Sequence, residues 1–454
     1  MHIPAKLIAK HNISVPRYTS YPTAPQWSAD VDPLAYPSRL AALGRTDRAL
    51  SLYFHIPFCQ SMCRYCGCNV VIRKQRPEVG DTYVDALIAE MALLAAQIGH
   101  RQSVRQLHLG GGTPNYLSRS QLQRLMSAAN HYFDIDFTGD ISVEVDPRTL
   151  ETDTLSALRE LGFNRLSMGL QDFTPEVQAH IGRIQPYEVV RSAFEHARKL
   201  GFLSINIDLI YGLPYQTPDN FRTTIEKVLS LSPDRIALYS YAHVPWLKSH
   251  QKLLHIDAMP NQDTKLQLFI QSRDLFLESG YIAIAMDHFA APTDDLAAAF
   301  TGGTLHRNFM GYTTKPADEF IGLGVTAIGF LDGMFSQNIH DLAQYYQRVQ
   351  AGQLPTEKGM VLSEDDCIRQ WVIQQLMCQM TVKKPEFMAR FGVDFDSYFS
   401  LVKPKLDAFE TEEFLIHSPE AIQLTPLGHF FVRNVCMVFD AYLEKKPARY
   451  SNTV

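Results

Sequence analysis

Between about residue 50 and residue 241, short apolar runs alternate with longer amphipathic stretches. Six of the short runs are rich in Val, Ile, Leu, Tyr or Phe and end at polar residues, Gly or Pro, which is typical of β-strands; they cover residues 50–55, 104–109, 140–145, 165–170, 204–210 and 235–241. The stretches between them have helical periodicity, as in residues 82–97, where Val84, Leu87, Met91 and Leu94 share one face. Strands that alternate with helices indicate parallel βαβ units. We therefore predict an α/β fold, a partial (β/α)6 TIM-like barrel with its chemistry at the C-terminal ends of the strands.

These patterns divide the chain into four regions, of which residues 50–245 are the predicted barrel core. Residues 1–49 are a lead-in with proline-flanked tyrosines, which we expect to pack on the barrel as an ordered, extended segment. Residues 246–360 extend the barrel with a helix near 261–278, an apolar strand at 281–286 and a Gly-rich stretch at 322–329. From about Ser363 the periodicity is mainly helical, so residues 361–454 are predicted to form a small, mainly helical C-terminal domain.

The composition is that of an ordinary globular protein. Of the 454 residues, 46% are apolar and 20% are charged, and the formal net charge is −6. Such a charge provides no global positive field that would attract nucleic acid. The N-terminus lacks the apolar core of a secretory signal, and no apolar run approaches the roughly 18 residues of a membrane span. We therefore expect a cytoplasmic protein with neither a nucleic-acid nor a membrane partner.

Four of the seven cysteines lie within ten residues, at Cys59, Cys63, Cys66 and Cys68. An odd total without a secretory signal argues against a disulfide framework. Thiolates spaced C-x3-C-x2-C suit three irons of an iron–sulfur cubane and leave the fourth iron open to a small chelating molecule. The second interpretation is a structural zinc site, which normally takes four ligands in two separated pairs, a pattern unlike this one. The third interpretation is that the cysteines are plain buried thiols. Spacing alone does not exclude Cys68 as a ligand.

Two further patterns follow the predicted strands. Gly-Gly-Gly-Thr-Pro at residues 110–114 comes directly after the second strand, where bare backbone lets a ligand approach closely. The Lys-Ser/Thr of a phosphate loop is missing from this run. Polar side chains then appear at or just beyond successive strand ends, at Glu144, Gln171, Arg183 and Asp208. The two carboxylates can accept hydrogen bonds from ribose hydroxyls or an ammonium group, and the arginine can pair with a carboxylate of a ligand. Taken one at a time, each residue is equally well explained as an ordinary polar loop residue.

The cysteine motif after a first β-strand resembles that of the radical S-adenosylmethionine superfamily. There the amino and carboxylate groups of the cofactor bind the fourth iron, and the reduced cluster cleaves the cofactor to methionine and a 5′-deoxyadenosyl radical. Within the superfamily, the sequence is similar to the oxygen-independent coproporphyrinogen III oxidases over roughly residues 12–445. Several similar blocks lie outside the cofactor motifs, and the full set covers residues 16–23, 53–69, 144–148, 166–173, 206–214, 241–243, 286–290 and 306–314.

The resemblance implies a 4Fe–4S cluster on Cys59, Cys63 and Cys66, while Cys68 matches a fourth cysteine that is not an ordinary ligand. It also implies two S-adenosylmethionine molecules in one site. The family's contacts to the first molecule match Tyr53, Gly111, Glu144 and Ile328, and Tyr53 is placed with the cysteines in the catalytic centre. The contacts to the second molecule match Tyr65, Gly112, Thr113, Gln171, Arg183, Asp208 and Ala242.

The reaction that the resemblance implies is two successive oxidative decarboxylations, which turn two propionates of coproporphyrinogen III into vinyls and give protoporphyrinogen IX. The adenosyl radical takes a hydrogen atom from the propionate β-carbon, and loss of carbon dioxide and one electron forms the double bond. Four substrate carboxylates need cationic or amide donors, and we expect Arg17 and Arg307 to supply two of them. The alternative for each arginine is a structural ion pair.

Two other classes of protein share the cluster motif. A haem-binding chaperone related to this family usually lacks the Gly67-Cys68-Asn69 continuation and the tyrosine-rich lead-in, and both are present here. A radical enzyme that acts on RNA is expected to carry a basic RNA-binding module, and the C-terminal region has no extended Lys/Arg run. The family further implies a monomer. Neither the electron donor that reduces the cluster nor the acceptor of the substrate's last electron is identified by the sequence.

Overall fold

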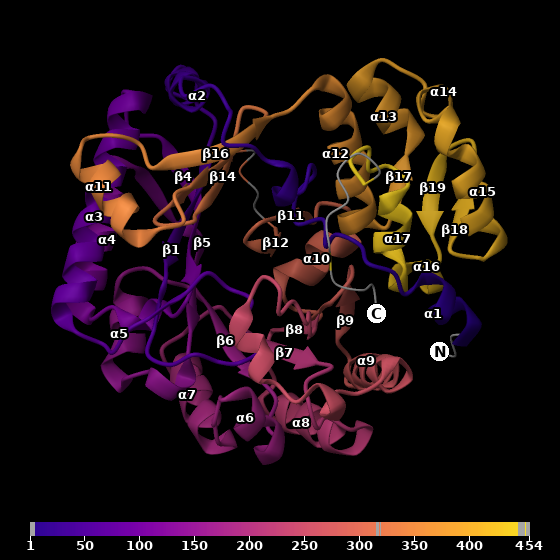
Figure 1. Ribbon diagram of the computed structural model, residues 1–454, viewed down its shortest axis with the longest axis horizontal. Helices are drawn as coiled ribbons and strands as arrows, with labels where there is room; N and C mark the ends of the chain where they lie inside the picture. The colour runs from indigo at the N-terminus through magenta and orange to yellow at the C-terminus, as the bar shows by residue number, and fades with distance from the viewer. Residues whose placement is uncertain (1–4, 315–316, 318, 444–449, 451–454) are drawn as a thin grey trace.

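The computed structural model describes residues 5–314, 317, 319–443 and 450, and its central feature is an open β-sheet (Figure 1). Twelve strands within these residues make up the sheet. In spatial order they are β16 (Thr356–Val361), β15 (Met334–Asn338), β14 (Ile328–Leu331), β13 (Glu319–Leu323), β1 (Leu50–Ile56), β4 (Ser103–Gly111), β5 (Asp134–Val145), β6 (Arg165–Gln171), β7 (Ser204–Tyr211), β8 (Arg235–Ser240), β10 (His288–Ala290) and β9 (Ile282–Ile284).

The strands from β13 to β8 run parallel, and they form the partial barrel. All six strands expected from the sequence are present, and the α/β fold class is confirmed. The sheet remains open because β16 and β9, at its two ends, do not pair with each other in the described part of the chain. An additional parallel strand, β13, pairs with β1. It lies partly within the Gly-rich stretch, whose glycines obscured its strand pattern.

Helices pack around the outside of the parallel strands (Figure 1). They are α3 (Pro77–Ile98), α4 (Arg119–Tyr132), α5 (Thr152–Glu160), α6 (Pro175–Ile181), α7 (Tyr187–Lys199), α8 (Pro218–Leu231), α9 (Gln262–Glu278) and α11 (Leu342–Gln350). Another helix, α10 (Asp295–Thr301), contacts the antiparallel strand β9 instead. The helix expected within residues 82–97 lies inside α3, which ends at Gly99 in a left-handed conformation. Ser118 and Gln121 form a capping box that begins α4.

The lead-in, drawn in indigo in Figure 1, runs from α1 (Ala5–His11) beside the C-terminal elements to α2 (Ala35–Leu43) at the top of the view. Between these helices the chain is largely extended apart from a short turn, η1 (Ala24–Gln26). Val15, Tyr18 and Tyr21 are buried there in an apolar core shared with the C-terminal elements. We expected an extended segment here, and the two helices were not predicted. Each helix is so short that its few apolar positions show no clear periodicity.

The last part of the chain is mainly helical, as the periodicity predicted. Its helices are α12 (Glu364–Gln379), α13 (Lys384–Phe391), α14 (Phe395–Tyr398), α15 (Lys403–Thr411), α16 (Pro426–Phe430) and α17 (Val432–Met437). A small antiparallel sheet of β17 (Thr381–Lys383), β19 (Ala421–Leu424) and β18 (Leu415–His417) was not expected, because such short strands give little alternation. Within the described residues, no helix combines the length and apolarity that crossing a lipid bilayer requires.

Candidate active site

A cavity of about 530 Å³ opens at the C-terminal ends of the parallel strands. Its walls come from the loop after β1 and from the ends of β4 to β8, where the barrel fold places functional groups. Most of the site residues expected from the sequence line it: Arg17, Cys59, Cys63, Tyr65, Cys66, Gly111, Gly112, Thr113, Glu144, Gln171, Arg183, Asp208 and Ala242. The tertiary structure thus brings together residues that are up to 225 positions apart in sequence, because the ends of neighbouring parallel strands meet at one edge of the sheet and the lead-in carries Arg17 to the same edge.

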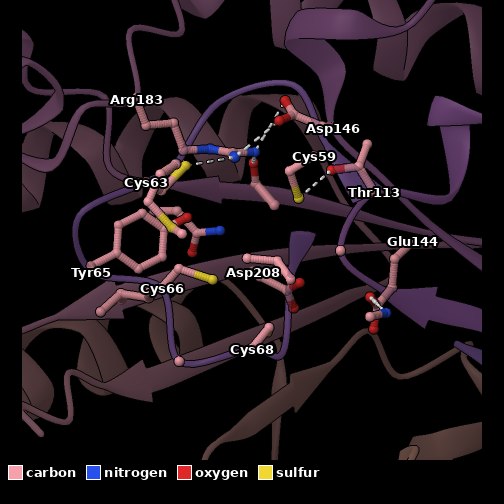
Figure 2. A pocket seen from close by; sticks show the side chains of 18 of the residues that line it. Cys59, Cys63, Tyr65, Cys66, Cys68, Thr113, Glu144, Asp146, Arg183 and Asp208 are labelled. Carbon is pink, nitrogen blue, oxygen red and sulfur yellow. Dashed lines mark hydrogen bonds and ion pairs between the residues drawn. The ribbon is translucent and has the colours of Figure 1, made fainter. Parts of the chain in front are cut away.

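The cysteine loop is fastened at both ends by a short parallel pair, β2 (Phe58–Cys59) and β3 (Val71–Ile72). Cys59 lies in β2, whereas Cys63 and Cys66 follow in the loop, and the N–H of Cys66 donates to the carbonyl of Cys63 over 3.1 Å. Figure 2 shows the three side chains turned toward the same cavity. All three are free thiols. This arrangement presents three soft sulfur ligands to one enclosed space, as an iron–sulfur cluster requires.

Cationic and polar groups surround these sulfurs. Nη2 of Arg148 lies 3.6 Å from Cys63 Sγ, and Nη1 of Arg183 lies 3.7 Å from it. Cys59 Sγ lies 3.2 Å from the hydroxyl of Thr113. Burial raises the pKa of Cys59 to about 11 despite this contact. The Cys59 thiol therefore ionises readily only beside a strong positive charge such as a bound metal centre.

Asp146 joins the two arginines, and the sequence reasoning did not select it. Its carboxylate accepts from Nη1 of Arg183 over 3.1 Å (Figure 2). It also accepts from Nη2 of Arg148 over 2.6 Å. Burial disfavours the charged carboxylate, but the hydrogen bonds and charges of both arginines lower the pKa of Asp146 below its ordinary value. Asp146 and Arg148 belong to the block at residues 144–148 that follows β5. Their position directly after a parallel strand was the signal that could have identified them.

The glycine run brings bare backbone to the cavity wall. Gly111 has a φ of +112°, which disfavours any residue with a side chain, and a Cβ atom there would lie 2.6 Å from the His55 ring. At Gly112 a Cβ atom would lie 2.7 Å from the carbonyl of Pro57. The Gly111 N–H donates to Glu144 Oε2 over 3.1 Å. The loop therefore lies against the start of the cysteine loop, where a cofactor can contact main-chain atoms directly.

Two carboxylates lie on the floor of the cavity. Burial raises the pKa of Asp208 to about 6, and the negative charge of Glu144 contributes, although Asn206 and Ser167 oppose the rise by hydrogen bonding. Burial also disfavours ionised Glu144, but hydrogen bonding and positive charge from His108 lower its pKa below the ordinary value. A second cavity, of about 140 Å³, lies against Glu144, Ser167 and Asp208. Two acidic groups in one enclosed site are suited to a cationic ligand.

Gln171 and Arg183 present polar atoms that the described residues leave without a partner. These atoms are Oε1 of Gln171 and Nε of Arg183, and both are buried. Gln171 also has a φ of +71°, an uncommon conformation that turns the end of β6. Buried polar atoms almost always have partners in folded proteins. Together with the three thiols and the bare glycine loop, these orphaned atoms fit a bound iron–sulfur cluster and a polar, charged cofactor.

Three of the expected residues lie away from this lining. The Tyr53 ring stacks on His108, and its hydroxyl lies 3.1 Å from Nδ1 of His55. Ile328 begins β14, two strands away from β1. Arg307 lies elsewhere and is half-buried, and its Nη1 donates to the carbonyls of Arg17 and Tyr18 over 2.9 and 3.0 Å. Arg307 therefore holds the backbone of the lead-in, whereas the side chain of Arg17 lines the cavity.

Comparisons with known proteins identify the family. The model of the Radical SAM superfamily matches residues 53–228, and that of the HemN C-terminal domain matches residues 362–431. The oxygen-independent coproporphyrinogen III oxidase of Synechocystis sp. is 40% identical over 446 residues, which cover 97% of this chain and 96% of that protein. The Escherichia coli protein of the same name is 42% identical over 441 residues, which cover 97% of this chain and 95% of that protein.

A solved structure agrees with the sequence relatives. It is that of coproporphyrinogen III oxidase (HemN) from Escherichia coli, described as a radical SAM enzyme. The two structures superpose with a TM-score of 0.92 at 40% identity, and the match covers 98% of this chain and 100% of that one. The chain therefore belongs to the oxygen-independent coproporphyrinogen III oxidase family and is a radical S-adenosylmethionine enzyme with a 4Fe–4S cluster.

Proposed function

We propose that the enzyme decarboxylates two propionates of coproporphyrinogen III to vinyls and releases protoporphyrinogen IX. The observation that carries this proposal is the single cavity in which three cysteine thiols face the glycine loop and the acidic floor. Cys59, Cys63 and Cys66 hold the cluster, and Gly111, Glu144, Gln171, Arg183 and Asp208 are among the residues that hold S-adenosylmethionine. When bound, the reduced cluster and this cofactor supply a primary carbon radical that removes a hydrogen atom from the substrate.

The chain's own residues position these groups. Arg148 and Arg183 place positive charge beside Cys63, while Asp146 fixes the direction of both guanidinium groups. Glu144 and Asp208 offer carboxylates to the cationic and hydroxyl groups of the cofactor. Since the cavity contains two such carboxylates, we propose that it accommodates two S-adenosylmethionine molecules.

Arg17 is the residue that we propose for binding a substrate carboxylate. It lines the cavity at the lead-in side, and its Nη2 donates to the Ser240 carbonyl over 2.6 Å. Lys265 and Arg433 lie close enough for their charges to interact with it: burial and the Arg17 charge lower the pKa of Arg433 to about 9 and that of Lys265 to about 8. Three neighbouring cations create a positive region that suits a substrate with four carboxylates.

We also propose that the enzyme acts as a monomer in the cytoplasm, with an external electron donor and acceptor. The seven thiols are all free, which is compatible with a reducing compartment. An intact cluster and a redox-active substrate both require such surroundings.

The test is an anaerobic assay with the reconstituted cluster, dithionite, S-adenosylmethionine and coproporphyrinogen III. We expect protoporphyrinogen IX, 5′-deoxyadenosine and methionine, measured by chromatography and mass spectrometry. Cys63→Ser should abolish all three products, whereas Cys367→Ser, in α12, should leave them unchanged. Arg17→Ala should raise the KM for coproporphyrinogen without affecting substrate-free cleavage of the cofactor.

Cofactor cleavage without decarboxylation would leave the radical chemistry in place and overturn the proposed substrate. In that case haem binding, titrated by its absorption band, would test the related chaperone function. Unchanged KM in Arg17→Ala would remove Arg17 from the substrate site.

A further inference from the structure

A basic segment lies directly beside the cysteine loop. It follows β3, which pairs with β2 so that Cys59 is opposite Ile72. The N–H of Arg73 donates to the carbonyl of Cys59 over 2.9 Å. Farther along, the Gln60 amide donates to Gln75 Oε1 over 3.2 Å, which joins the segment to the loop a second time. The segment is therefore hydrogen-bonded directly to the backbone of Cys59, a proposed cluster ligand.

The cationic side chains of this segment are exposed. Arg73, Lys74 and Arg76 are all exposed, and none of their side chains forms an ion pair with another residue in the described ranges. Arg64 adds a fourth cation from the cysteine loop itself, where its Nη1 donates to the His180 carbonyl over 2.9 Å. Elsewhere in the structure most arginines pair with acidic residues, and the chain as a whole carries a net charge of −6. The local charge next to the loop is thus positive, whereas the net charge of the whole chain is negative.

Apolar side chains accompany the cations on both sides of the loop. Ile72 is 37% exposed and Ile184 is 61% exposed. Ile184 follows the turn at Gly182, and the loop is bound to this turn because the N–H of Arg64 donates to the Ile181 carbonyl over 2.8 Å. Gln60 and Ser61 of the cysteine loop are also exposed. A protein that docked here would contact the loop through a patch that combines apolar and charged side chains.

We propose that this basic rim, made of Arg64, Arg73, Lys74 and Arg76 with Ile72 and Ile184, docks an acidic protein that carries one electron to the cluster. The inference rests on the proposed function, because the cluster must be reduced before each cleavage of the cofactor. One electron leaves the reduced carrier and enters the oxidised cluster, so the carrier is oxidised by one electron and the cluster is reduced by one. Complementary charge speeds the encounter of such partners and orients their redox groups, and salt weakens this effect.

The test compares two triple charge reversals in the full-length enzyme with its cluster reconstituted. The first variant is Arg73→Glu/Lys74→Glu/Arg76→Glu. The matched control is Arg45→Glu/Arg105→Glu/Lys199→Glu, which changes three exposed cations at the opposite, N-terminal end of the parallel strands. Neither set belongs to the catalytic machinery. The probe is a bacterial flavodoxin, an acidic flavin carrier, reduced chemically and mixed with the enzyme in an anaerobic stopped-flow instrument.

We expect the association rate constant of the rim variant to fall at least about tenfold at low salt, and the control to keep the wild-type rate. The rim variant should also lose most of the salt dependence. Dithionite, a small reductant that needs no docking surface, should drive 5′-deoxyadenosine formation equally in all three proteins. This arm also separates the two proposals, because its failure in the wild type would count against the radical function and not against docking.

Three results would overturn the docking proposal. They are equal rates for the rim variant and the wild type, an equal loss of rate in the control, and the absence of any measurable association between the wild type and the reduced carrier.

Discussion

At the scale of single residues, the cavity separates groups of opposite charge. Arg148 and Arg183 lie beside Cys63, whereas Glu144 and Asp208 lie on the floor. The two carboxylates differ in their proton affinity because their neighbours differ. His108 lowers the pKa of Glu144, while burial and the charge of Glu144 raise that of Asp208 to about 6. Asp208 is thus the acidic group of the floor that titrates closest to neutral pH.

This raised pKa predicts that the affinity for S-adenosylmethionine falls as the pH drops from about 7 to about 5, since the ionised carboxylate is then lost. Asp208→Asn should bind the cofactor more weakly at pH 7 and should show a flatter pH profile. Glu144 and His288 are the other charged or titratable groups whose fields act on Asp208. Equilibrium binding at a series of pH values measures the effect, with Asp219→Asn in α8 as the control.

A profile in Asp208→Asn that parallels the wild type would show that another group is responsible for the pH dependence.

At the scale of elements, a short helix supports the outer side of the cysteine loop. The helix η4 (Ser249–Leu253) and the residue before it direct three side chains at the loop backbone. Nζ of Lys248 donates to the Cys68 carbonyl over 2.9 Å, the His250 ring to the Cys66 carbonyl over 2.8 Å, and the Gln251 amide to the Tyr65 carbonyl over 3.0 Å. Three carbonyls of the loop are therefore held from outside, while the thiols of Cys59, Cys63 and Cys66 line the cavity.

We expect loss of these contacts to loosen the cluster. Groups that support metal ligands typically contribute 10- to 100-fold to metal affinity, so Gln251→Ala and Lys248→Met should each release iron to a chelator about tenfold faster. Lys252→Met makes the same charge change in the same helix without touching the loop, and it should retain the wild-type rate. The loss of the cluster absorbance over time measures the release. Equal release in all three variants would show that the loop does not depend on this helix.

At the scale of the whole molecule, the lead-in joins the barrel to the C-terminal elements. Arg433 of α17 donates to the Pro16 carbonyl over 3.1 Å, and Gln370 of α12 donates to the Tyr21 carbonyl over 2.9 Å. From the barrel side, Trp27 stacks on Phe335 of β15 at 4.9 Å between ring centroids. The same segment places Arg17 in the cavity. Assembly of the substrate side of the site is therefore coupled to the packing of the C-terminal elements.

Tyr21 is the residue through which this coupling is best measured. Its ring is 2% exposed, and its hydroxyl accepts a hydrogen bond from the Ala441 N–H over 3.1 Å. Tyr21→Ala should reduce the free energy of unfolding by about 3–5 kcal/mol, the usual range for removing a buried aromatic ring. Tyr21→Phe removes only the hydrogen bond and should reduce it by about 1 kcal/mol. Urea denaturation of the apo-protein gives both values, and equal losses in the two variants would show that packing of the ring contributes little.

Local sequence patterns were sufficient to predict the barrel strands and the cysteine motif. A buried parallel strand is a continuous apolar run, and the ligand spacing of a cluster loop lies within one segment, so both signals survive without tertiary information. Because the strands were predicted, the positions of Glu144, Gln171 and Asp208 at or near the strand ends could be predicted as well. Asp146 and Arg148 escaped selection because their role depends on Arg183 and Cys63, which come from other parts of the chain.

The sequence by itself thus determined the α/β class, the order of the parallel strands and the three thiols, since periodicity and spacing are properties of neighbouring residues. Only the tertiary structure decided that β13 continues the sheet beside β1. It also decided that Arg307 binds the backbone carbonyl of Arg17, whose side chain lines the cavity, and that a basic segment lies against Cys59. Each of these is a contact between segments that are distant along the chain or joined by a non-local pairing. Such contacts depend on how the whole chain packs, and local patterns carry no record of them.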